Sequence, residues 1–117
     1  MRKILGIMGL VLLPILAHAA QNTLTWVDNS TNETSFKVER TTASSVANCA
    51  TAGGFTQIAT VGPDIVTYVD SSVNEGTTYC YRVRASNTAG DSAYSNIAGR
   101  LVPFTIPAAP ANLQVGP

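Results

Sequence analysis

The chain is poor in the residues that build catalytic and metal sites. It has one histidine, His18, and two cysteines, Cys49 and Cys80, which are too few for the four ligands of a tetrahedral zinc site. A thiol would also have no imidazole nearby to activate it, and the acidic side chains are scattered over predicted loops. We therefore expect no metal, no cofactor and no enzymatic activity.

An excess of charge of one sign is missing as well. The sequence has 7 basic and 7 acidic residues, which together make up 12% of the chain. Two of the basic residues, Arg2 and Lys3, stand at the very N-terminus, so the remainder is slightly acidic. Without a basic patch, the protein is not expected to bind nucleic acid or an anionic membrane.

The one long apolar run is too short to span a bilayer. It covers residues 4–16, about 13 residues, whereas a membrane-spanning helix needs roughly 20. It follows the two basic residues and precedes Ala17-His18-Ala19, which offers small side chains where a signal peptidase recognises them. This layout predicts a bacterial-type signal peptide at residues 1–19 and a secreted, extracellular protein with no membrane contact after cleavage. A permanent anchor is the disfavoured alternative.

From Gln21 onward the sequence shows no helical period. Runs with alternating polar and apolar residues are separated by clusters of Asn, Asp, Gly, Ser and Thr, which is typical of short strands. In the longest run Tyr79, Tyr81 and Val83 share one face, while Cys80 and the neighbouring arginines share the other. Strands at this spacing predict an all-β sandwich. The runs are residues 23–27, 35–41, 55–61, 65–69, 78–85 and 92–98.

Three segments resemble a bacterial, secreted fibronectin type III domain. They are Leu24-Thr25-Trp26, the run from Phe36 to Arg40 and the run from Val73 to Asn87, and the resemblance covers residues 21–98. It implies an immunoglobulin-like sandwich in which Trp26 is the core tryptophan of the second strand, B. It also implies that Tyr79 is the corner tyrosine, whose hydroxyl returns to the backbone ahead of its own strand.

The two cysteines are expected to form a disulfide in an exported protein. Cys80 points away from the predicted core, and Cys49 lies in the loop after the third strand, C. Because strands C and F are neighbours in the fold that the chain resembles, a bridge across the outer face is feasible. Pairing between two molecules is the alternative.

The first strand of that family, strand A, is missing from its usual place. It often ends in Asn-Leu-x-Val, yet only residues 20–22 separate the predicted cleavage site from strand B. The pattern occurs instead near the C-terminus. We therefore predict a body at residues 20–98, a linker at 99–107 and a donor tail at 108–117. The predicted donor strand consists of Ala111, Asn112, Leu113, Gln114 and Val115.

Without strand A, an apolar groove with Leu24, Trp26, Tyr68 and Tyr79 at its base is expected to stay open and to favour association. The linker at residues 99–107 reaches about 30 Å, which is about the height of a sandwich, so a return to the same body would be strained. We expect donation of the tail to a second copy, which gives head-to-tail filaments.

Three alternatives stay open. In the first, the tail inserts into its own body. In the second, it is a disordered linker or the stub of a longer array. In the third, the protein is a monomeric cell-surface module that binds carbohydrate or another protein.

Overall fold

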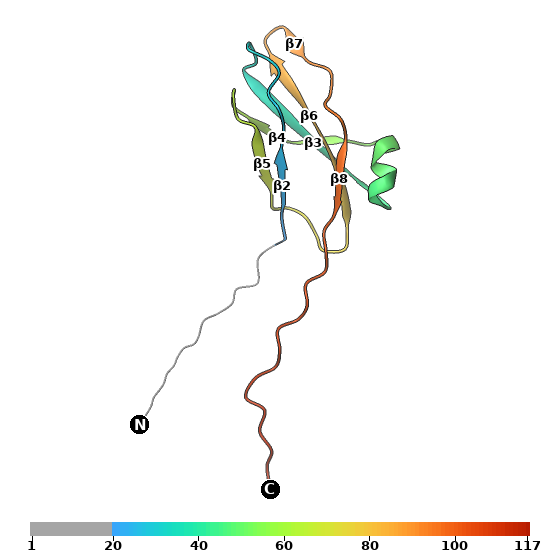
Figure 1. The fold of residues 1–117 in the computed structure, drawn as a ribbon, viewed down its shortest axis with the longest axis vertical. Coiled ribbons are helices and arrows are strands. Elements are labelled where there is room, and N and C mark those ends of the chain that lie inside the picture. The colour runs from blue at the N-terminus through green and yellow to red at the C-terminus, as the bar shows by residue number, and fades with distance from the viewer. Residues whose placement is uncertain (1–19) are drawn as a thin grey trace, which may run out of the picture.

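The computed structural model describes residues 20–117, so the predicted signal peptide at residues 1–19 lies outside the described residues. The described residues form two antiparallel sheets, which confirms the all-β sandwich (Figure 1). Within residues 20–117, no helix is both long enough and apolar enough to cross a membrane.

The smaller sheet has two strands in the described part of the chain, β2 (Asn22–Thr25) and β5 (Thr67–Asp70). Leu24 packs against the core, whereas Thr23 and Thr25 on either side of it are exposed, as the alternation predicted. Beyond the paired residues, the amide of Trp26 donates a hydrogen bond to the carbonyl of Val66 at 3.0 Å. The two strands therefore stay together for one more residue pair.

The larger sheet is built from β3 (Ser35–Ala43), β4 (Thr56–Val61), β6 (Thr78–Asn87), β7 (Gly90–Asp91) and β8 (Ala98–Leu101). At its centre β3 pairs with β6, with Ser35 opposite Ser86 and Ala43 opposite Thr78. β4 flanks β3, while β7 and β8 both pair with β6. The neighbouring positions of β3 and β6 agree with the expected C and F strands.

The sandwich has two poles that matter for the site. The turn between β6 and β7 lies at the upper pole, and β2 begins at the lower pole (Figure 1). The chain also leaves the sandwich at the lower pole after β8 (Figure 1). The start of β2 and the start of the tail are therefore at the same end of the body.

The core lies between the sheets and is built mainly from the inward faces of β3 and β6. Val38 is fully buried, and Tyr79 is only 4% exposed. The hydroxyl of Tyr79 accepts a hydrogen bond from the amide of Asn74 at 2.9 Å, which is the corner contact that the resemblance implied. The buried core residues are Phe36, Val38, Val73, Tyr79, Tyr81, Val83 and Val102.

The predicted disulfide between Cys49 and Cys80 is present and buried. Cys49 lies on the 3-10 helix η2 (Val46–Thr51), which begins after the N-cap residue Ser45, where the sequence had predicted only a loop. The bridge fastens this helix to β6. The bridge also lies against β8, as shown by Gly99, where an added Cβ would overlap the sulfur of Cys49.

The end of the body differs from the prediction. Residues 92–98 do not form one strand: the amides of Ser92 and Ser95 donate to β6 carbonyls, and regular pairing resumes only in β8. Val102, 2% exposed, then joins the core and exchanges backbone hydrogen bonds with the turn at Gly76 and Thr77. Residues 99–102 are therefore part of the body and not of the linker, because their backbone is paired.

Candidate functional site

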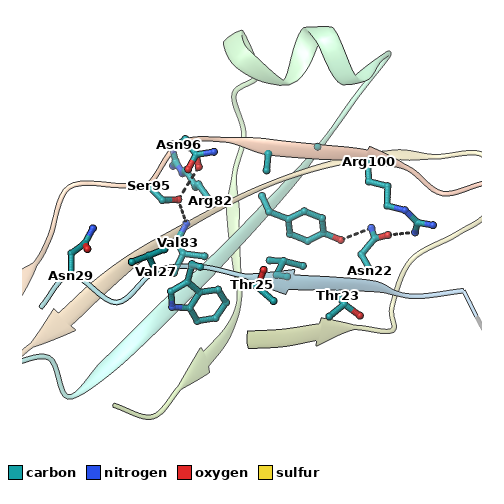
Figure 2. Close-up of a pocket in the computed structure, with 15 residues that line it drawn as sticks. Asn22, Thr23, Thr25, Val27, Asn29, Arg82, Val83, Ser95, Asn96 and Arg100 are labelled. Carbon is teal, nitrogen blue, oxygen red and sulfur yellow. Dashed lines mark hydrogen bonds between the residues drawn. The ribbon is translucent and has the colours of Figure 1, made fainter. Parts of the chain in front are cut away.

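A groove separates the free edge of β2 from β8. Its volume is about 740 Å³. One wall is β2 with Val27, the other is formed by residues 95–100, and Tyr81 and Val83 of β6 also line it (Figure 2). A smaller hollow of about 290 Å³ continues past Trp26 toward the upper pole. Together the two hollows run along the length of β2.

The backbone of β2 presents unpaired groups to this groove. On its other side β2 pairs with β5, and the amide of Trp26 points toward Val66 of that side. Since backbone groups of successive residues in an antiparallel strand point to opposite sides, the N–H and C=O groups of Thr23 and Thr25 point into the groove. Among residues 20–117, no strand pairs with this edge. Such an edge is a template for another strand.

The base of the groove is apolar, whereas most residues along its rim are polar. Leu24 and Trp26 line it and are half-buried, and they pack against the core. These are two of the four groove and core residues predicted from the sequence. The other two, Tyr68 and Tyr79, lie in or against the core and do not line the groove. Tyr81 lines the groove instead; the alternation of β6 had placed its side chain inward, but nothing in the local pattern assigned it to the groove.

A polar cluster closes the lower end of the groove. The amide nitrogen of Asn22 donates to the hydroxyl of Tyr81 at 2.9 Å, and the guanidinium of Arg100 donates to the amide oxygen of Asn22 at 2.6 Å. Figure 2 shows Asn22 and Arg100 together at one end, with Asn29 and Asn96 at the other. The apolar surface is therefore limited to the part of the groove above Asn22.

The same cluster continues into the core through Asp70, which is only 1% exposed. Its carboxylate accepts hydrogen bonds from the Tyr81 hydroxyl at 2.7 Å and from Arg40 at 2.9 Å. Burial acts to raise the pKa of Asp70, but these bonds and those from Ser72 outweigh it and hold the pKa below its usual value. Burial raises the pKa of Tyr81, so its hydroxyl stays a donor at neutral pH.

The chain is fastened where it leaves the body. The ring of Phe104 covers Gly76, where an added side chain would overlap it, and the hydroxyl of Thr105 donates to Glu75 at 2.9 Å. Beyond these contacts the chain extends away from the sandwich (Figure 1).

The predicted donor strand makes no contact with its own groove. Leu113 and Val115 are each 92% exposed. Residues 111–115 form no strand in the described structure, and none of them is among the residues that line the groove of the same body. In the described structure the groove is therefore unfilled, and the tail is exposed to solvent.

The outer face of the larger sheet carries several ion pairs. Arg82 contacts Glu39 at 2.8 Å, and Lys37 contacts Asp91 at 3.0 Å. The guanidinium of Arg82 also stacks on the ring of Tyr94, 3.7 Å from its centre. Since these charges are paired with each other, the face offers little free charge to a ligand.

Three carboxylates meet at the upper pole, which sequence reasoning did not anticipate. Asp28, Glu33 and Asp64 come from two loops, and each offers an oxygen within 4.8 Å of the others. Glu33 accepts hydrogen bonds from Ser30 and from the amide of Asp64, which hold its pKa at about 2. The charge of Glu33 in turn raises the pKa of Asp64. These bonds connect the two loops to each other.

Sequence comparisons give one short similarity. No family model matches the chain. An amylopullulanase of Thermoanaerobacterium saccharolyticum is 44% identical over 45 residues, which are 38% of this chain and 4% of that enzyme. The chain thus spans a small fraction of the length of this curated relative.

Solved structures resemble a much larger part of the chain than this short sequence match does. A human fibronectin type III domain aligns with a TM-score of 0.60 and 17% identity, over 84% of this chain and 78% of that domain. The sixth such domain of human fibronectin type III domain containing protein 3 gives a TM-score of 0.57 and 20% identity, over 80% and 81%. A pectate lyase of Pectobacterium carotovorum gives 0.58 and 26%, over 82% of this chain and 27% of the lyase. The chain has the fibronectin type III fold.

Proposed function

We propose that this chain, a fibronectin type III sandwich with a free edge on its smaller sheet, is a secreted subunit that assembles head to tail. Residues 108–117 of one molecule add as a strand to β2 of the next. The observation that carries the proposal is the unpaired edge of β2 beside an apolar groove, in a chain whose own tail has a matching alternation. The buried disulfide fits an oxidising, extracellular location.

The apolar side chains of the tail should decide the affinity. Burying Leu113 and Val115, both almost fully exposed here, contributes about 1.5–3 kcal/mol each. A backbone bond to Thr23 or Thr25 replaces a bond to water and contributes only about 0.5–1.5 kcal/mol. Any extended segment can form such backbone bonds, whereas the two apolar side chains are particular to this tail. Binding should therefore depend on Leu113 and Val115.

The exit point of the tail favours a neighbour over the same body. Thr105 is held at the lower pole by Glu75, so the chain is free only from Ile106 onward. A strand antiparallel to β2 must start at the upper pole, because β2 begins at the lower one. To reach its own groove, the tail would have to extend residues 106–111 upward by about 20 Å and then reverse direction. A molecule stacked below presents its upper pole directly.

Two complementary variants of the full chain test the proposal. Leu113→Asp/Val115→Asp disables the tail, and Asn112→Asp/Gln114→Asp is its matched control, with the same charge on the outward positions. Thr25→Pro disables the groove, because the proline removes an N–H that faces it and its ring occupies the space where the added strand would pair; Thr25→Val is its control. Light scattering should show that wild type and both controls assemble, while each disabled variant stays monomeric.

Mixing the two disabled variants gives the decisive result. The intact groove of one and the intact tail of the other should produce a one-to-one dimer and nothing larger. If the mixture stays monomeric, or if Leu113→Asp/Val115→Asp assembles as wild type does, donation between molecules is wrong. The tail variants leave the body unchanged, so this second outcome does not depend on how well Thr25→Pro folds.

A second candidate function is an accessory module for carbohydrate. It is favoured by the similarity to an amylopullulanase and to part of a pectate lyase, whose names both point to polysaccharides. A monomeric wild type that sediments with insoluble starch or pectin would support it. Failure to bind either, together with assembly, would leave strand donation as the function.

A further inference from the structure

We infer a specific register for the donated strand: Leu113 lies opposite Trp26, and Val115 lies opposite Leu24 of the acceptor molecule. The inference rests on the proposed strand donation and adds which tail residue meets which acceptor residue. Three features carry it: the alternation of β2, the polar lower end of the groove and the positions of the prolines in the tail.

Alternation removes half of the possible registers. Leu24 and Trp26 pack against the core, and residues directly opposite in an antiparallel pair point to the same face. For Leu113 and Val115 to be buried, each must lie opposite one of these inward positions. A slip of one residue would expose both apolar side chains, so only shifts of two remain.

The polar lower end of the groove decides against a downward shift of two. That shift would place Leu113 opposite Leu24 and Val115 opposite Asn22. Asn22 is 3% exposed, and its amide is held by Tyr81 and Arg100. A valine there would lie against buried polar groups and gain little, whereas opposite Leu24 it covers apolar surface.

The end of β2 decides against an upward shift of two. That shift would place Leu113 opposite Asp28, where the chain has turned into the loop whose Ser30 bonds to both Asp28 and Glu33. Only Val115 would then cover the groove. The inferred register is the one that places both apolar residues on the apolar part of the groove.

The prolines of the tail agree with this choice. In the inferred register, Gly116, Gln114 and Asn112 lie opposite positions 23, 25 and 27, whose backbone groups point to the open edge. All three tail residues have an N–H to donate to that edge. The downward shift would instead bring Pro110 opposite Val27, where proline has no N–H to donate.

Cysteine cross-linking between two full-length variants tests the register. The acceptor carries Thr25→Cys and a tail disabled by Leu113→Asp/Val115→Asp. The donors carry the groove change Thr25→Pro and one of three tail cysteines: Gln114→Cys, Asn112→Cys or Gly116→Cys. All four introduced cysteines lie on outward positions, away from the buried native disulfide. Mixtures are oxidised mildly, and the covalent dimer is measured on a non-reducing gel.

The Gln114→Cys donor should give the covalent dimer, and the other two donors should give none. Directly opposite residues lie within the Cα separation that a disulfide allows, whereas residues two positions away lie about 7–8 Å apart. If Asn112→Cys or Gly116→Cys cross-links in its place, the register is wrong while strand donation stands. If no donor cross-links although the two disabled variants form a dimer, the register is again wrong. Absence of both cross-links and dimer overturns the proposed function itself.

Discussion

The hydroxyl of Tyr81 should contribute more to stability than any other tyrosine hydroxyl of the core. It donates to the buried carboxylate of Asp70 at 2.7 Å and accepts from Asn22 at 2.9 Å, so it joins the two sheets beneath the groove. Tyr81→Phe removes both hydrogen bonds and keeps the ring. A bond to a charged group contributes about 1.5–3 kcal/mol and a neutral one about 0.5–1.5 kcal/mol. The free energy of unfolding should therefore fall by about 2–4.5 kcal/mol.

Tyr68→Phe is the matched control. It removes the same atom from another residue that packs against the core, and the structure of residues 20–117 shows no hydrogen bond to the hydroxyl of Tyr68. Its effect should stay within about 0.5 kcal/mol. Urea unfolding can be followed by the fluorescence of Trp26, the one tryptophan of the chain. Equal losses for the two variants would refute the reasoning, because the ring and not the hydroxyl would then matter.

Three further predictions concern the body. Replacing Cys49 and Cys80 together by Ser should lower the free energy of unfolding by about 3–4 kcal/mol, as measured by urea titration; an unchanged midpoint would contradict this. Asp70→Asn should lower the free energy of unfolding above about pH 4, and the difference from wild type should shrink as the pH falls through the lowered pKa of Asp70. The difference is measured by unfolding both proteins across this pH range. A difference that grows in acid would contradict the prediction. Trp26 lies half-buried against the core and not inside it, so Trp26→Ala should lower the free energy of unfolding by no more than about 3 kcal/mol, the lower end of the range for fully buried aromatic side chains; an unchanged melting temperature would show that Trp26 does not stabilise the core.

The sequence predicted the strands and their two faces well wherever polar and apolar residues alternate strictly. The run 78–85 predicted both faces of β6, and from it followed the inward Tyr79 and Tyr81 and the outward Cys80. The disulfide and the corner contact of Tyr79 could be anticipated because each depends on neighbouring strands of a known sandwich.

Other features depend on contacts that no local pattern encodes. The segment after β7 alternates like a strand, but the hydroxyls of Ser92 and Ser95 accept bonds from β6 amides and interrupt the regular ladder. Likewise, the sequence predicts a loop at Asp70, yet this residue is buried because Arg40 and Tyr81 supply its donors from the other sheet. Such partners are far apart in sequence, so burial of the polar group cannot be deduced from its neighbours.

If tails are donated between molecules as proposed, the geometry of the exchange sets the number of subunits, and this number can be tested by varying the protein concentration. Two molecules could exchange tails reciprocally only if their grooves faced each other, which would crowd both tails and both β2 edges into one interface. The free segment 106–111 reaches about 20 Å, which is enough to pass from the lower pole of one body to the upper pole of a body stacked beneath it. Stacking leaves one groove and one tail unused at the ends, so growth does not close. The mass of the wild type should therefore keep rising with protein concentration in sedimentation velocity, and a plateau at the dimer would show reciprocal exchange instead.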